Sequence, residues 1–115
     1  VTLNGREVGA EAVGAESGKA SFGRYLALPN GAWASLGFLY EVPAAVILTG
    51  GVYEYRLLVQ KQAGASAMPL DVSVDVPDGA SVQSVTLDGE RLEGRPLDIQ
   101  TELDRDREFV IRYRP

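Results

Sequence analysis

Apolar and polar residues alternate through much of the chain, and this pattern predicts short β-strands. The longest alternating stretch is residues 53–62, whose apolar residues recur at every second position: Tyr53, Tyr55, Leu57 and Val59. Leu58 breaks the alternation. An apolar side chain on the otherwise polar face is typical of a central strand that is partly covered on both sides. We therefore expect the rest of the chain to pair around this stretch.

The second half of the chain holds further stretches with a period of two: residues 70–76, 82–87, 97–103 and 109–114. In the first of them, Asp71, Ser73 and Asp75 separate the apolar residues, which predicts a strand with one face in solvent. Asp88-Gly89 follows the second stretch and is typical of a hairpin turn. These stretches predict consecutive antiparallel strands.

The start of the chain gives a less regular pattern. Asn4-Gly5 lies between two short runs with strand character and predicts a hairpin over residues 1–8. Residues 9–18 are rich in Gly, Ala, Glu and Ser, and we interpret them as a loop or a weakly held edge. A short helix over residues 10–15 is the alternative, although glycines at both ends disfavour it.

The longest hairpin predicted from the sequence lies between residues 19 and 42. Residues 19–28 and 33–42 each place apolar side chains at alternate positions, and Pro29-Asn30-Gly31 between them is typical of a turn. Pro43 ends the second arm, because proline cannot donate to a strand ladder. A further short strand is predicted over residues 45–48.

These elements add up to an all-β protein of about seven to nine short strands, with turn signals at the spacing of a β-sandwich. No long amphipathic helix and no βαβ pattern is predicted. We expect an antiparallel β-sandwich of the immunoglobulin or fibronectin type III class, formed as a single domain over residues 1–115. The sequence holds no Cys, so an antibody-type domain with an inter-sheet disulfide is excluded.

Charge and composition narrow the function further. The chain carries a net charge of −5, which disfavours binding to nucleic acid and to an anionic membrane surface. No apolar run is long enough to span a bilayer, so we expect no membrane insertion by this segment. The chain begins with Val1 in place of Met, and we expect it to be a processed or excised part of a larger protein.

Two motifs resemble the β-rich C-terminal segment of a family of bacterial membrane-anchored envelope proteins that is defined only as a domain of unknown function. They are residues 18–31 (GKASFGRYLALPNG) and residues 55–64 (YRLLVQKQAG). The family has proline where this chain has Asn30 and Ala63, which places the geometry of these turns in question more than the fold.

The resemblance implies an extracytoplasmic module of a larger envelope protein. Its partners would be neighbouring domains of that protein and a cell-surface polysaccharide or envelope protein. The resemblance implies no catalytic residue. We interpret the second motif as a structural signature that locks the strands together, and its residues are Tyr55, Leu57, Val59, Gln60, Lys61 and Gln62. The alternative is that its polar end presents hydrogen-bond donors to a partner.

The absence of His and Cys excludes catalytic triads, Cys-His dyads and zinc sites built on these residues. Only carboxylates remain as candidates for catalysis. Asp71 and Asp75 lie on one strand face at about 13 Å, which exceeds the separation in glycosidases. Asp104 and Asp106 raise the alternative of a weak calcium site, but arginines beside them favour paired surface charge. We therefore predict no catalytic residue, cofactor or metal.

Aromatic residues suggest the second candidate function. Tyr25 and Trp33 lie near the predicted turn, on the parity opposite the main apolar set, where they would form an exposed surface that could stack on sugar rings. Packing of these rings against a second layer or a neighbouring domain is the competing interpretation. The sequence thus predicts a non-catalytic structural or interaction module, with a carbohydrate-binding module as the alternative.

Overall fold

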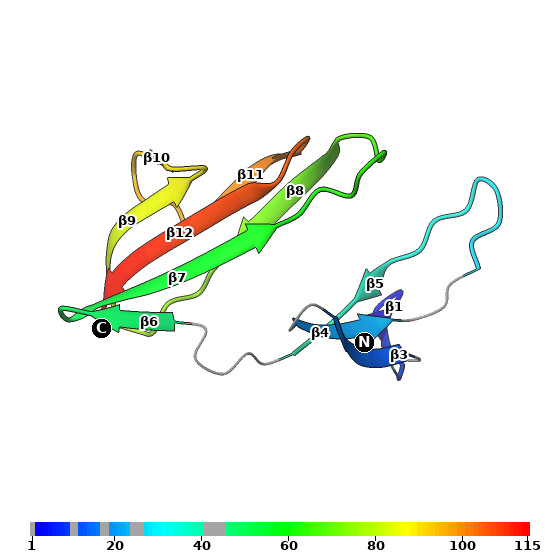
Figure 1. Ribbon diagram of the computed structural model, residues 1–115, viewed down its shortest axis with the longest axis horizontal. Coiled ribbons are helices and arrows are strands. Elements are labelled where there is room, and N and C mark those ends of the chain that lie inside the picture. The colour runs from blue at the N-terminus through cyan, green and yellow to red at the C-terminus, as the bar shows by residue number, and fades with distance from the viewer. Residues whose placement is uncertain (1, 10–11, 17–18, 24–26, 41–45) are drawn as a thin grey trace. The chain divides into compact units, whose positions relative to one another are not determined.

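The computed structural model describes residues 2–9, 12–16, 19–23, 27–40 and 46–115, with only the backbone described for residues 12–16 and 19–23. The described part of the chain contains β-strands and no helix, and every strand pair in it is antiparallel (Figure 1). Its contacts divide the chain into unit 1, Val1–Val42, and unit 2, Pro43–Pro115. The all-β class predicted from the sequence is confirmed, and a single domain over residues 1–115 stays a prediction.

Unit 1 consists of short strands in two small sheets. β1 (Thr2–Leu3) pairs with β2 (Arg6–Glu7) and with β5 (Leu36–Gly37), whereas β3 (Ala12–Glu16) pairs with β4 (Lys19–Gly23). Asn4 and Gly5 have φ values of 52° and 78°, as a type I′ turn requires, so the hairpin predicted at the start of the chain is confirmed. Asn4 also accepts a hydrogen bond from the Ser35 amide through Oδ1, at 2.6 Å, which ties this turn to the chain before β5.

Residues 24–26, 41 and 42 of the long hairpin predicted between residues 19 and 42 lie outside the described residues, and in the rest of its arms the predicted pairing is wrong. Its turn forms, because the amide of Ala32 donates to the carbonyl of Pro29 at 3.0 Å and Gly31 has φ of 78°. The arms, however, pair elsewhere: β4 pairs with β3, and the return arm contributes only the short β5. Small residues fill much of residues 27–37, and they offer a sheet little side chain to pack.

Of the interpretations given for residues 9–18, the loop and the helix are wrong where the structure describes the chain, whereas the edge is consistent with it, because β3 lies in a two-stranded sheet with β4. Ala12–Glu16 is a strand, in register with β4 from Ala12 opposite Gly23 to Glu16 opposite Lys19. Ala and Gly are poor strand formers, so the intrinsic preference of this segment gave no sign of the pairing. A neighbouring strand close in the sequence supplies its hydrogen bonds, and closing so short a connection costs little chain entropy.

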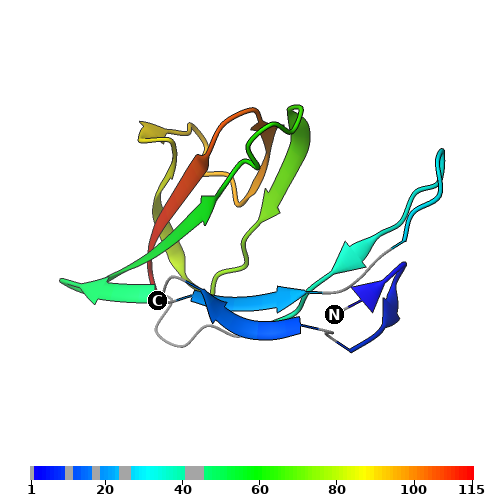
Figure 2. The ribbon, with the colours of Figure 1, turned by 45° about the vertical axis from the view of Figure 1, so that its right-hand side comes forward.

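Unit 2 contains a five-stranded sheet and a two-stranded sheet (Figure 2). The larger sheet has the order β10-β9-β12-β7-β6, with β6 (Val46–Thr49), β7 (Val52–Val59), β9 (Ser81–Leu87), β10 (Glu90–Arg91) and β12 (Arg107–Arg114). The smaller sheet pairs β8 (Met68–Ser73) with β11 (Asp98–Leu103). The strands predicted over residues 45–48, 70–76, 82–87, 97–103 and 109–114 all form, with shifted ends.

Apolar residues from both sheets form one core. Val72 of β8 and Ile99 of β11 pack with three residues of the larger sheet, Val85, Phe109 and Ile111. Phe109 and Ile111 have no exposed surface, and Val85 is 1% exposed. Burying a side chain of this kind stabilises a fold by roughly 1.5–3 kcal/mol, so these contacts hold the two sheets together.

β12 carries the centre of this core. It pairs with β7 from Arg107 to Tyr113 on one side and with β9 from Phe109 to Arg114 on the other. Phe109 and Ile111 face the smaller sheet, whereas Val110, on the opposite face, is also buried at 8% exposure. A period-two pattern predicts burial of only one face of a strand. It does not predict the burial of Val110, because the residues that cover Val110 lie on neighbouring strands.

A register shift lets β9 keep its apolar residues on the core side. Val85 and Leu87 share one parity in the sequence, whereas Val82 has the other. Between Arg112 and Tyr113 of β12, the facing residue of β9 changes from Ser84 to Val82, so β9 has one extra residue at Gln83. Such a bulge reverses the side-chain alternation. Val82 therefore packs against the core beside Leu87.

Residues 53–59 of the stretch over residues 53–62 belong to β7, whereas residues 60–62 follow the strand; β7 lies between β12 and β6, as predicted for a central strand. Leu58 is nevertheless 49% exposed, so the expected cover on both faces is wrong at this residue. Leu58 is exposed because β6 is short: it pairs only with Val52–Tyr55 and does not extend beside Leu58. Within the described residues, the second half of β7 has a neighbour only on the side of β12.

Candidate functional site

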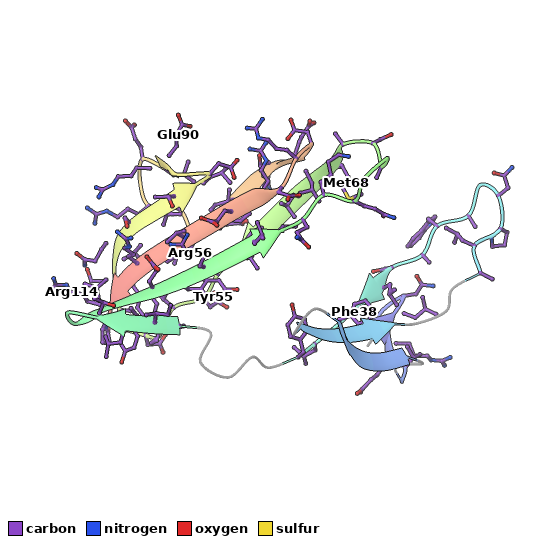
Figure 3. All side chains as sticks on the ribbon, viewed as in Figure 1. Phe38, Tyr55, Arg56, Met68, Glu90 and Arg114 are labelled. Atoms are coloured by element: carbon purple, nitrogen blue, oxygen red, sulfur yellow. The ribbon has the colours of Figure 1, made fainter. Side chains whose placement is uncertain are left out.

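The aromatic residues predicted to form a sugar-binding surface lie in unit 1. Trp33 follows the turn at residues 30–31, and 82% of its surface is exposed. Tyr25 lies outside the described residues, so the predicted pairing of the two rings has no structural description. Other large apolar side chains on residues 27–40 are exposed as well, among them Leu28, Phe38, Leu39 and Tyr40 (Figure 3 labels Phe38).

The apolar residues of the signature motif belong to the core of unit 2. Tyr55, Leu57 and Val59 lie on the face of β7 that packs against the central cluster. Arg56 lies on the other face, where half of its side chain is exposed (Figure 3). The alternation of β7 thus places these three residues where they stabilise the sheet pair.

The polar end of the signature motif connects two loops. The amide of Lys61 donates to Oδ1 of Asp106 at 2.8 Å, and Asp106 lies in the loop between β11 and β12. The Lys61 ammonium donates to the carbonyls of Gln62 and Ala65, at 3.2 and 2.5 Å. Gln60 and Gln62 are exposed. Lys61 therefore holds the chain where it leaves β7.

A buried arginine organises the same end of unit 2. Only 11% of the Arg107 side chain is exposed, and it donates to Oδ2 of Asp88 at 2.7 Å and to Oδ1 of Asp104 at 3.1 Å. Its Nε also donates to the carbonyl of Glu102 at 3.0 Å. Arg107 thus joins the turn after β9 to the loop before β12. Its planar guanidinium has N–H groups in several directions, so it can donate to these three acceptors at once.

Asp88 is bound from two sides. Its Oδ1 accepts from the amide of Glu108 at 2.9 Å, and its Oδ2 meets Arg107. The Glu108 amide first, and the guanidinium of Arg107 second, hold the pKa of Asp88 below its ordinary value. Asp88 has a φ of 52°, which Asp tolerates better than most residues. The predicted Asp88-Gly89 turn and this hydrogen-bond network therefore depend on the same residue.

The two carboxylates considered for calcium have partners in the protein, Asp104 within this network and Asp106 outside it. Asp104 pairs with Arg107, and Asp106 accepts the bond from the Lys61 amide. In the part of the chain that the structure describes, no group of three or more His, Cys, Asp or Glu residues is placed to hold a metal ion.

On its outer face the larger sheet carries a ladder of opposite charges. Glu54 and Arg112 face each other across β7 and β12, and Arg112 donates to Glu54 at 2.9 Å. Arg56 donates to Glu108 at 2.7 Å. The bond from Arg112 is the main reason that the pKa of Glu54 is lowered. These side chains flank Val110, and their aliphatic parts can shield it from water.

The smaller sheet carries a different arrangement of carboxyl groups. Asp71 of β8 lies diagonally across the ladder from Asp98 of β11, and a hydrogen bond with Asp98 raises the pKa of Asp71 above its ordinary value. Ser73 donates to Oδ1 of Asp98 at 3.2 Å. Sequence spacing paired Asp71 with Asp75 instead. The contact with Asp98 depends on strand register, which a single sequence does not reveal.

A cleft of about 280 Å³, lined mostly by apolar side chains, lies between the two sheets at the end of β8. It is lined by residues of both sheets and of the segment after β8: Val46, Tyr55, Ser73, Val74, Asp75, Val76, Ile111 and Tyr113. No sequence pattern pointed to it. The cleft and the carboxyl pair both involve β8, so apolar surface and negative charge lie close together on this strand.

Comparison of the chain with known protein families, with curated proteins and with solved structures finds no match. Among the described residues there is also no helix long and apolar enough to cross a membrane.

We expect Asp88→Asn to lower the free energy of unfolding by about 2 kcal/mol at neutral pH, since a hydrogen bond to a charged group contributes about 1.5–3 kcal/mol. Asn keeps an oxygen for the Glu108 amide and tolerates the turn, so the lost charge opposite Arg107 decides the result. Because the folded pKa of Asp88 is lowered, its contribution is present above the unfolded pKa of about 3.9 and disappears as the pH falls through the folded pKa.

Urea unfolding followed by far-UV circular dichroism, repeated from neutral to acid pH, checks this expectation. The gap between wild type and Asp88→Asn should close in acid. Asp78→Asn is the matched control, since Asp78 is exposed in the turn from Pro77 to Ala80 and its change should stay within about 0.5 kcal/mol. A gap that keeps its size or widens in acid would show that Asp88 does not act through its charge.

Proposed function

We propose that this chain is a non-catalytic structural or interaction module of a larger, exported, envelope-associated bacterial protein. The observation that carries the proposal is the use of its signature motif: Tyr55, Leu57 and Val59 pack into the core, and Lys61 ties β7 to the loop before β12. The exported, envelope-associated setting is supported by the resemblance of residues 18–31 and 55–64 to the envelope family.

The order of strand pairs supports an immunoglobulin-like β-sandwich in unit 2. In immunoglobulin domains, strands B and E lie in one sheet and strands C and F in the other, so that the two pairs interlock. Here β8 pairs with β11 and β9 pairs with β12, in different sheets, and the chain visits them in the order β8, β9, β11, β12.

One departure from the immunoglobulin order is specific to this chain. The position beside β12, which strand G would take after F, belongs to β7, and β7 comes before β8 in the sequence. We infer an immunoglobulin-like sandwich in which the flanking strand enters from the start of the unit.

The use of charge supports a non-catalytic role. Arg107, Arg112 and Arg56 bind carboxylates that would otherwise be candidates for acid and base catalysis. Of the carboxyl groups with a shifted pKa in the described part of the chain, only Asp71 has a raised value, and it lies on the exposed face of the smaller sheet. General acid catalysis at neutral pH needs such a shift together with a site that holds the substrate.

We therefore expect the purified chain to show no turnover of glycosides, esters, phosphates or peptides. Asp71→Asn is the decisive variant in this assay, because it removes the carboxyl group with the raised pKa while it keeps the shape of the side chain. Turnover that the wild type shows and Asp71→Asn loses would contradict the proposal. A complete reading frame that encodes a freestanding cytoplasmic protein would contradict the exported setting.

The exposure of Trp33 favours a second candidate, a carbohydrate-binding module that uses Tyr25 and Trp33. Trp33 is the only tryptophan in the chain, and 82% of its surface is exposed. An exposed indole ring can stack on the apolar face of a sugar. The uncharged residues around it, from Leu28 to Leu39, leave such a platform open to a neutral polysaccharide.

Titration with cell-wall and capsular polysaccharides, followed by tryptophan fluorescence, tests this candidate. Glycan binding predicts a saturable change in emission and, by a second method such as calorimetry, binding that falls about tenfold or more in Trp33→Ala. Leu39→Ala is the matched control, because Leu39 is 95% exposed and aliphatic, and its removal should leave binding unchanged. An unchanged emission across a broad panel of polysaccharides would rule out this use of Trp33.

A further inference from the structure

We propose that the free edge of β8 binds an extended peptide segment, in which apolar residues alternate with Lys or Arg, as an added antiparallel or parallel strand. This inference deepens the proposed function and rests on it, since it names the kind of partner that an interaction module of this shape would take. Three features of unit 2 meet at β8: open backbone groups, an apolar cleft and unpaired negative charge.

The backbone of β8 has a free side. The smaller sheet consists of β8 and β11 alone, so within the described residues β8 has a strand neighbour on one side only (Figure 2). The amide of Val74 donates to the carbonyl of Leu97 at 2.8 Å, towards β11. Because the hydrogen-bonding direction alternates along a strand, Asp71 and Ser73 turn their N–H and C=O groups away from β11. These groups can form a ladder with an added strand.

Pro69 fixes where such a ladder can begin. It lies on β8 opposite Glu102, at a position of the same parity as Asp71 and Ser73. Proline has no N–H to offer and is tolerated in sheets where that group would face outward. Pro69 therefore blocks the first part of the edge, and the strand-binding part runs from Asp71 towards Asp75, beside the cleft.

The cleft supplies the pocket that strand addition needs for specificity. The larger sheet of unit 2 has five strands and the smaller sheet has two, so a third strand beside β8 would lie over surface that β8 and β11 leave open. The cleft of about 280 Å³ lies at the end of β8, where Tyr55, Ile111 and Val74 line it. An added strand meets such a pocket with every second side chain, so apolar residues at alternate positions fit it.

The negative charge near β8 indicates which residues of the added strand would lie between its apolar residues. Asp71, Asp75 and Asp98 are exposed, and none of the ion pairs found among the described residues involves them. The carboxyl groups of Asp71 and Asp98 are also in contact with each other. A lysine or arginine on the outer face of an added strand would relieve this repulsion. A second copy of β8 would bring more aspartate to the same edge, which disfavours self-association.

Two peptides of identical composition separate this proposal from non-specific attraction. One alternates Lys and Val over eight residues, and the other places its four Val before its four Lys. We expect the alternating peptide to bind about tenfold or more tightly than the blocked one, because it alone presents a charged and an apolar face as a strand. Calorimetry gives the affinities, and amide shifts in nuclear magnetic resonance spectra should centre on residues 71–75.

Two variants test the backbone and the charge separately. Ser73→Pro removes an N–H that faces away from β11, so the variant should keep the fold. Its affinity for the alternating peptide should fall about tenfold. Asp71→Lys leaves the backbone groups in place and should lower the affinity for the alternating peptide to a similar extent. Circular dichroism shows that each variant is folded, and Asp78→Asn is the control on an exposed turn.

Each contrary result has a definite meaning. Equal affinity of both peptides, amide shifts on another strand, or full binding by folded Ser73→Pro would overturn strand addition at β8. A dimer of the wild-type chain that Ser73→Pro abolishes would show that a second copy occupies this edge, and would overturn the basic-peptide partner. Cleavage of the bound peptide would contradict the non-catalytic role while leaving the binding edge intact, so the two proposals fail by different observations.

Discussion

The structure of unit 2 depends on β12, because it is the strand whose backbone and side chains are committed on every side. β7 and β9 take its hydrogen-bonding groups, and Phe109 and Ile111 fill the space between the two sheets. The charged residues serve the same strand. Arg107 fixes its start to the turn after β9, and Arg112 pairs with Glu54 on its outer face. Packing and ion pairing therefore act together to hold one central strand.

A consequence of this arrangement is that the two sheets of unit 2 differ in their number of strands. A five-stranded sheet built around β12 faces a pair of strands, so surface between the sheets is left open beside β8. The arginines that neutralise carboxylates lie on the larger sheet and its loops, whereas Asp71 and Asp98 on the smaller sheet meet each other. The recognition that we propose at β8 would thus use the outer face and free edge of the smaller sheet, whose inner face contributes Val72 and Ile99 to the core.

The sequence predicts most of unit 2, because local signals and tertiary contacts agree there. Period two marked its strands, and Asp88-Gly89 marked a turn whose φ values bear it out. What the sequence could not supply is register. The burial of Val110, the contact between Asp71 and Asp98, and the bulge at Gln83 all arise between strands far apart in the chain. In unit 1 the segment Ala12–Glu16 consists mostly of residues with low strand preference, so the sequence allowed an edge or a loop there but did not predict the pairing with β4.

Amide hydrogen exchange tests most directly whether β12 is the strand on which unit 2 depends. The amides of Phe109, Val110 and Ile111 should be the slowest to exchange, and their protection should match the free energy of global unfolding of the unit. Amides of β7 and β9 that bond to β12 should follow closely, with those of β8 and β11 exchanging faster. Exchange at β12 that is faster than at β8 or β11 would contradict the account.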